Sequence, residues 1–193
     1  MALSNASKAG AAVFVGAVQF SIFLIVAEAL SPAYSVSSNF ISDLGKVFPS
    51  SALVFNSSAF LFGLLVLAGA YFLQKAFKWR PASALVALAG VGLIGVGSFP
   101  EGSPYGLHGI FSLLTFLSAG LSAIVLARFQ RKPMFYFSAI LGLVSLFMLV
   151  GYVGEIYLGL GAGGMERMVV YPTLVWALGF GGYLMAIEKA PAS

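Results

Sequence analysis

The chain has 193 residues, of which 60% are hydrophobic and only 8% carry a charge. Soluble domains carry charge on about a quarter of their residues, so the composition excludes a soluble globular protein and indicates a fold whose solvent is lipid. The absence of cysteine excludes disulfide bonds, thiol redox chemistry and cysteine-ligated zinc. We predict no cofactor.

Six apolar runs each have about the twenty residues that a transmembrane helix needs. They cover residues 10–30, 51–73, 83–99, 107–127, 134–158 and 168–187. The first run is longer than the about 7 to 15 apolar residues of a signal peptide, so we interpret it as a retained span. The sequence therefore predicts an all-α fold: one transmembrane domain over residues 1–193, a six-helix bundle that crosses the cell membrane repeatedly.

Charge predicts the orientation of this bundle. Six crossings place both termini on one side, and basic residues in short loops mark the cytoplasmic side. Basic residues on the side of the termini are Lys8, Lys75, Lys78, Arg80, Arg128, Arg131, Lys132 and Lys189, against Lys46 and Arg167 on the other side. Most acids lie opposite the termini, at Glu28, Asp43, Glu101, Glu155 and Glu166, with Glu188 as the exception. We therefore predict cytoplasmic termini.

Small residues recur along the spans, and in lipid they allow helices to approach closely. We expect them to form helix contacts rather than ligand sites. They are Ala59 and Gly63; Ala119, Ala123 and Ala127; Ser138 and Gly142; Gly90, Gly92, Gly95 and Gly97; and Gly179, Gly181 and Gly182.

Polar residues gather at the outer ends of the spans, where they are costly unless they face a cavity or a partner. The first outer loop contains the polar segment 39–45, and span four begins with His108, the chain's single histidine. Ser112 and Thr115 follow His108 on the same helix face. We interpret the group as an outward-facing cavity.

The candidate site residues fall into two classes. A histidine with a pKa of about 6.5 can exchange protons near neutral pH, so the candidate acid–base residues are His108, Asp43, Glu101 and Glu166. The candidate binding residues are Asn39, Ser42, Asn56, Ser112, Tyr152, Glu155 and Arg167. We predict no metal site, since zinc bound by one histidine and carboxylates is uncommon.

Helix capping is a competing interpretation of the acids. A carboxylate at a helix N-terminus is favourable by about 0.3 to 1 kcal/mol, which covers Glu166 and Glu101, and we also favour a capping role for Glu28. Glu155 lies at a helix C-terminal end, where the dipole disfavours it. It therefore requires a partner, and Arg167 is the nearest candidate in the sequence.

Several short motifs, in this order and placement, resemble a known family. They are Ile41-Ser42-Asp43-Leu44-Gly45, Phe99-Pro100 with His108, and Glu166-Arg167 before a span containing Trp176. The chain resembles the uncharacterised prokaryotic six-span membrane proteins numbered 998 among the domains of unknown function. More distantly, the first motif is similar to one in damage-regulated autophagy modulator and GPI-anchor remodelling membrane proteins, with Leu44 where that type has threonine. The resemblance implies a six-helix fold and a function related to lipids.

Three functions remain open. The first is binding, with or without acid–base modification, of a membrane lipid or other amphiphile in the outer cavity. The second is transport of a small molecule or protons, against which no span carries a charge near its midplane. The third is a scaffold without a ligand. The basic residues are divided among small loops, which excludes a nucleic-acid-binding surface. The glycine-rich segment 159–164 is either a lid over the cavity or a plain flexible link. The sequence leaves the oligomeric state open.

Overall fold

The computed structural model describes residues 2–46 and 48–187, which form six long helices and two short 3-10 helices with no strand among them. The long helices are α1 (Asn5–Ala29), α2 (Pro49–Phe77), α3 (Arg80–Ser98), α4 (Leu107–Ala127), α5 (Met134–Val153) and α6 (Gly161–Ala186). The 3-10 helices are η1 (Ile41–Gly45) and η2 (Pro104–Gly106). The six long helices are long and apolar enough to cross a membrane, which confirms the predicted all-α, multi-pass membrane fold.

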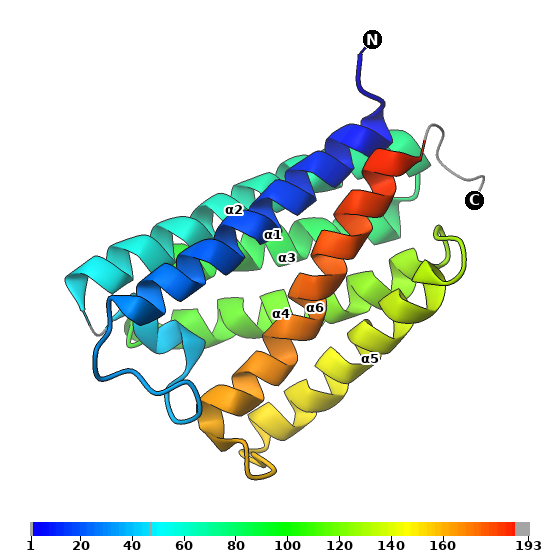
Figure 1. The fold of residues 1–193 in the computed structure, drawn as a ribbon. Helices are drawn as coiled ribbons and strands as arrows, with labels where there is room; N and C mark the ends of the chain where they lie inside the picture. Colours follow the sequence, from blue (N-terminus) through cyan, green and yellow to red (C-terminus); the bar gives the residue numbers. More distant parts are fainter. Residues whose placement is uncertain (1, 47, 188–193) are drawn as a thin grey trace.

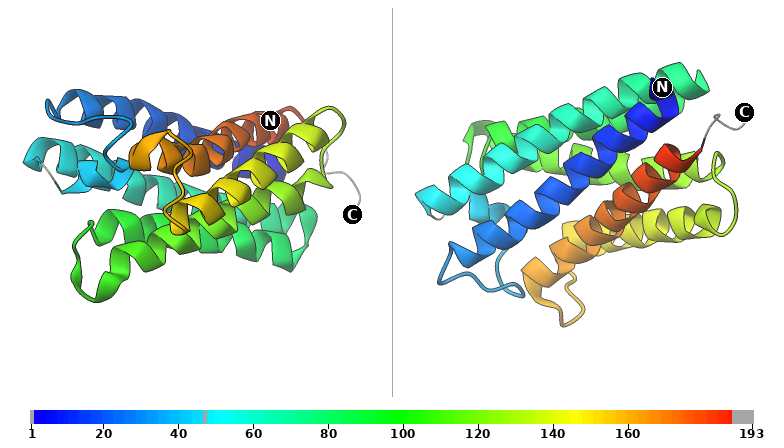
Figure 2. Two further views of the ribbon diagram at one scale, coloured as in Figure 1. Left: turned by 90° about the horizontal axis from the view of Figure 1, so that it is seen from below. Right: turned by 45° about the horizontal axis from the view of Figure 1, so that its top comes forward.

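The helices run alternately in opposite directions, and each packs against its neighbours in the chain (Figure 1). α6 returns to pack against α1 and also touches α4. Five helices, α1, α2, α3, α4 and α6, therefore surround a common interior. α5 lies outside this ring, against α4 and α6 (Figure 2).

The two ends of the bundle differ in character. η1, η2 and the turn between α5 and α6 lie at one end, which we call the polar end. The start of α1 and the end of α6 lie together at the other, the basic end (Figure 1). By their places in the helices and turns, the basic end carries Lys8, Lys75, Lys78, Arg80, Arg128, Arg131 and Lys132; Glu188 and Lys189 lie outside the described residues. The assignment of the basic end to the cytoplasm stays a prediction.

Paired glycines allow three pairs of helices to approach closely. A β-carbon on Gly63 would lie 2.7 Å from the carbonyl oxygen of Gly90, and one on Gly90 would lie 3.0 Å from that of Gly63. The pairs are Gly63 with Gly90 (α2 and α3), Gly10 with Gly181 (α1 and α6), and Gly120 with Gly142 (α4 and α5). The predicted contact role is confirmed for Gly63, Gly90, Gly142 and Gly181 in these pairs. It is also confirmed for three further glycines of α3 that meet α4 or α2, namely Gly92, Gly95 and Gly97, whereas Gly182 faces open space.

Two predicted boundaries are wrong. The prediction extends span five to residue 158, whereas α5 ends at Val153. The backbone turns into the left-handed region at Glu155, with φ of 57°, and the N–H of Ile156 returns to the carbonyl of Gly151 at 2.8 Å. The prediction also starts span six at residue 168, whereas α6 starts at Gly161. Residues 161–164 are therefore the first turn of α6 and neither a lid nor a flexible link.

Candidate functional site

The polar segment 39–45 folds into the polar end of the bundle. All five residues of η1 are buried. Asp43 caps the N-terminal end of this helix, because its Oδ2 accepts a hydrogen bond from the backbone N–H of Phe40 at 2.9 Å. The carboxylate supplies an acceptor that the first amides of a helix otherwise lack. The segment predicted as a polar loop thus contains a short, fully buried 3-10 helix.

α2 and α6 hold η1 in place. The side-chain amide of Asn56 in α2 donates to the carbonyl of Gly45 at 3.0 Å. From α6, the carboxylate of Glu166 accepts a hydrogen bond from the backbone N–H of Ile41. Glu166 is only 3% exposed, so its carboxylate belongs to the interior of the protein.

Lys46 joins η1 to the loop that follows α3. Its Nζ lies 2.9 Å from the carboxylate of Asp43 and 3.0 Å from that of Glu101. The second oxygen of Glu101 accepts a hydrogen bond from the hydroxyl of Ser42 at 3.1 Å. Burial acts to lower the pKa of Lys46, but its hydrogen bonds to the two carboxylates outweigh that effect and raise it. Lys46 therefore stays cationic.

His108 is held by both ring nitrogens. Nδ1 lies 2.9 Å from the carbonyl oxygen of Phe99, and Nε2 lies 3.2 Å from the hydroxyl of Ser112. A carbonyl only accepts, so Nδ1 carries the hydrogen and Nε2 of the neutral ring accepts from Ser112. Within the described part of the chain, His108 forms no ion pair with a carboxylate, and no three His, Asp or Glu side chains are grouped to hold a metal ion.

Arg167 connects the end of α1, the first loop and α6. Its Nη2 donates to Glu28 at 2.5 Å and to the hydroxyl of Tyr34 at 2.7 Å. Its Nη1 donates to the carbonyls of Val36 at 2.8 Å and Gly163 at 3.0 Å. Burial raises the pKa of Tyr34 to about 12 in spite of the adjacent guanidinium, so the phenol stays neutral. We call these five residues the Arg167 hub.

The predicted pairing of Arg167 with Glu155 is wrong. Glu155 lies exposed beyond the end of α5, and Glu28 takes its place. The capping interpretation is also wrong for two acids. Glu28 binds a guanidinium, and Glu166 binds the amide of Ile41 rather than the first amides of its own helix.

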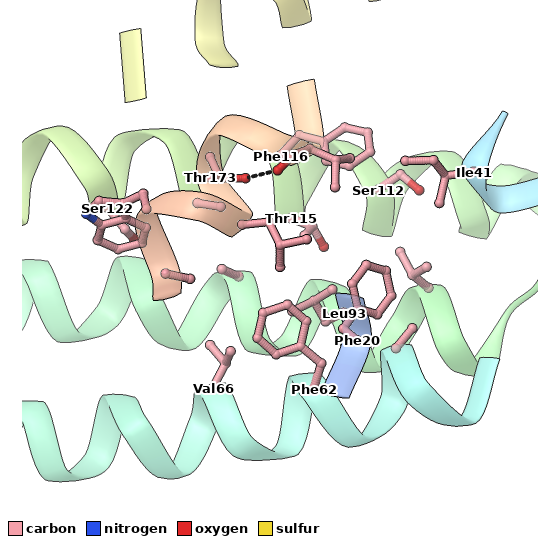
Figure 3. A pocket seen from close by; sticks show the side chains of 18 of the residues that line it. Phe20, Ile41, Phe62, Val66, Leu93, Ser112, Thr115, Phe116, Ser122 and Thr173 are labelled. Atoms are coloured by element: carbon pink, nitrogen blue, oxygen red, sulfur yellow. Dashed lines mark hydrogen bonds between the residues drawn. The ribbon is translucent and has the colours of Figure 1, made fainter. Parts of the chain in front are cut away.

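A narrow pocket runs along the interior of the helix ring, and we call it the central pocket. It has a volume of about 110 Å³. Figure 3 shows Ile41 and Ser112 at one end and Ser122 at the other. Between His108 and Ser122, both in its wall, α4 rises about 21 Å at 1.5 Å per residue. The wall is mainly apolar and includes Val13, Phe20, Phe62, Val66, Leu93 and Phe180.

A second pocket, with a volume of about 440 Å³, lies at the polar end between α4 and α5. We call it the end pocket. Ser42, His108, Ser112 and Phe116 line both pockets, and we call these four residues the shared wall. Of the other predicted site residues, Glu101 and Tyr152 line the end pocket and Glu166 lines the central pocket, whereas Asn39, Asp43, Asn56, Glu155 and Arg167 line neither.

Sequence reasoning missed several residues of this region. Phe116 follows His108 and Ser112 at the same four-residue spacing, so helical periodicity could have found it. Lys46 is assigned to the outer side by charge counting, but nothing in its spacing indicates that it bridges two carboxylates. No sequence signal points to Tyr34.

Comparison with known proteins identifies a family for this chain. No curated protein and no solved structure matches the chain. The family described as "Protein of unknown function (DUF998)" matches residues 14–183, a range that contains the shared wall and the Arg167 hub. This match confirms the first resemblance read from the sequence motifs, while the more distant one stays a prediction. The chain therefore belongs to the DUF998 family of proteins of unknown function.

Proposed function

We propose that this protein binds an amphiphile of the cell membrane, with the polar head in the end pocket and the apolar chain in the central pocket. The observation that carries the proposal is the shared wall, because its four residues belong to both pockets. An amphiphile that extends past these four residues from one pocket into the other would have its head beside Ser42 and Glu101 and its chain among apolar side chains. Membrane lipids are molecules of this form.

The dimensions of the central pocket suit one chain. A bilayer has a hydrocarbon core of about 30 Å, so the chain of a lipid covers about 15 Å within its leaflet. The pocket follows α4 for about 21 Å, which gives such a chain sufficient length. Its volume of about 110 Å³ is smaller than that of a whole acyl chain, so the side chains that line it must separate for the chain to enter.

Charge around the pockets favours an uncharged or cationic head group. Asp43 and Glu101 share the single cation of Lys46, and Glu166 adds a third carboxyl group from α6. Arg167 is occupied by the hub. A phosphate would meet uncompensated carboxylates there, which is unfavourable, whereas a hydroxyl or ammonium group would find acceptors.

Aromatic rings support the same head-group class. Phe40, Phe116 and Tyr152 line the end pocket. The ring of Tyr152 meets those of Phe40 and Phe116 edge to face, at centroid distances of 5.7 Å and 6.1 Å. Aromatic faces attract ammonium groups, and they also pack against the carbon skeleton of a neutral polyol.

Replacing Ala89 with leucine tests the chain-binding pocket. Ala89 is 6% exposed and lines the central pocket, so the added carbons occupy the space of the bound chain. Overpacking costs about 1 to 3 kcal/mol, and we therefore expect co-purified lipid to fall about tenfold or more. The measurement is mass spectrometry of lipid extracted from the purified protein, as a molar ratio.

The matched control is Ala84→Leu, which adds the same carbons to an exposed position of the same helix. It should keep the lipid content of the unmodified protein. Equal lipid loss in both variants, or no stoichiometric lipid in the unmodified protein, would contradict amphiphile binding and favour the scaffold interpretation.

The contact of His108 with Ser112 favours a second candidate function, which is acyl transfer from an ester-bearing amphiphile. A serine hydroxyl that donates to a histidine whose other nitrogen is held is the arrangement of an activated nucleophile. The Ser112 oxygen would attack the ester carbonyl, and His108 Nε2 would take the hydroxyl proton and pass it to the leaving alcohol. Water would then hydrolyse the acyl-serine.

An alkyl fluorophosphonate, which phosphonylates activated serines, tests this candidate. We expect the unmodified protein to be labelled and labelling to be lost in Ser112→Ala and in His108→Gln. Ser57→Ala, an exposed serine of α2, should leave labelling unchanged. Absence of labelling in the unmodified protein, or labelling that persists in Ser112→Ala, would exclude the acyl-transfer role.

A further inference from the structure

We infer that the far end of the central pocket is a second polar subsite, which accepts an oxygen carried on the chain of the bound amphiphile. This inference rests on the proposed function and specifies its ligand class. The two donors are Ser122 of α4 and Trp176 of α6, which both line the central pocket. We call them the far-end donors.

Both donors are buried and unpaired. Ser122 is 1% exposed and Trp176 is 7% exposed. Neither the hydroxyl of Ser122 nor the indole Nε1 of Trp176 has a hydrogen-bond partner among the described residues. An indole N–H can only donate, and a buried donor without an acceptor is costly. An acceptor from outside the chain would remove this cost.

Two other hydroxyl groups of the pocket already donate to an acceptor within the protein. Thr115 donates to the carbonyl of Phe111 at 2.9 Å, and Thr173 donates to that of Val170 at 2.9 Å. Each of these hydroxyls is satisfied by its own helix. The unpaired donors are therefore a specific feature of Ser122 and Trp176 and not a general property of the pocket.

The position of the far-end donors defines the ligand. Ser122 lies at the end of the pocket opposite Ile41 (Figure 3), about 21 Å along α4 from His108 at 1.5 Å per residue. Trp176 lies about 15 Å along α6 from Glu166 by the same measure. The ligand class is thus an amphiphile with a polar head, a long apolar stretch and a second oxygen well down the chain, as a hydroxyl or carbonyl group.

Two glycerides that differ by one hydroxyl test the subsite. The probes are monooctadecanoylglycerol and the same molecule with a hydroxyl group near the far end of its acyl chain. Their affinities are measured with the full-length protein in detergent, by displacement of tritiated monooctadecanoylglycerol. We expect the hydroxylated probe to bind about fivefold more tightly, which is the gain that one net hydrogen bond supplies.

The preference, taken as the ratio of the two affinities within each variant, should disappear in Trp176→Phe and weaken in Ser122→Ala. Ser58→Ala is the matched control, since its hydroxyl is also buried and unpaired among the described residues but does not line the pocket. This variant should keep the preference.

A second readout uses fluorescence. The chain has two tryptophans, so Trp79→Phe leaves Trp176 as the single emitter, and its emission should shift to longer wavelength with the hydroxylated probe only. Equal binding of both probes would overturn the subsite and leave amphiphile binding intact, with buried water as the source of the acceptor. If neither probe binds, the proposed function fails together with the subsite.

Discussion

Replacing Arg167 with methionine is expected to lower the free energy of unfolding by about 3 to 5 kcal/mol, the cost of breaking a buried ion pair on one side. Arg167 is 6% exposed and donates to Glu28, to Tyr34 and to backbone carbonyls of the first loop and α6. Methionine fills a similar volume but satisfies none of these acceptors. The measurement is unfolding of the purified protein by SDS in mixed micelles.

Two further variants separate charge from geometry. Arg167→Lys keeps the charge but lacks the planar fork that serves several acceptors at once, so we expect most of the loss to remain. Glu28→Gln combined with Arg167→Met removes the uncompensated carboxylate and should recover part of the loss.

Lys46→Met is the control for an exposed ion pair, because that side chain is 40% exposed and exposed ion pairs contribute only about 0 to 1 kcal/mol to stability. A loss for Arg167→Met no greater than for Lys46→Met would refute the hub's structural role.

Replacing Gly63 with leucine should cost about 3 kcal/mol or more of unfolding free energy, at the upper end of overpacking effects. Its β-carbon would lie 2.7 Å from the carbonyl oxygen of Gly90 and equally close to the backbone nitrogen of Ile94. Backbone atoms cannot rotate away as a side chain can, so α2 and α3 would have to separate. The same SDS titration measures the effect.

Gly182→Leu is the matched control in α6, since a β-carbon there meets nothing within 4 Å. The substitution removes a glycine from a helix interior, where glycine is less favourable than other residues by up to about 1 kcal/mol. We therefore expect unchanged or slightly higher stability. Equal destabilisation by the two leucines would show that the glycine pairs do not set the distance between helices.

The sequence predicts the spans well because apolar length is a local property. It also places His108 and Ser112 together, since four residues along a helix bring side chains to the same face. Hydropathy fails at the start of α6, where Glu166 and Arg167 lie inside the helix and are satisfied by the first loop and the end of α1.

The ion pair between Glu28 and Arg167 could not be predicted. Its partners are 139 residues apart, whereas Glu155 lies close to Arg167 in sequence and fits equally well by charge. Only the path of the backbone decides between them, because the left-handed turn at Glu155 ends α5 before that carboxylate can reach α6. The central pocket depends on five helices at once, and the end pocket depends on α4, α5 and two loops, so neither pocket has a sequence signal of its own.

The Arg167 hub has a consequence for biogenesis. Glu28, Tyr34 and Val36 are synthesised early, whereas the guanidinium that binds them belongs to α6, more than 100 residues later in the chain. Until the ribosome has delivered α6 to the membrane, the first loop lacks this anchor and Glu28 lacks its counter-charge. Closure of the helix ring by α6 is therefore also the step that completes the polar end, so a nascent chain that stalls before α6 would present an unfinished loop to quality-control proteases.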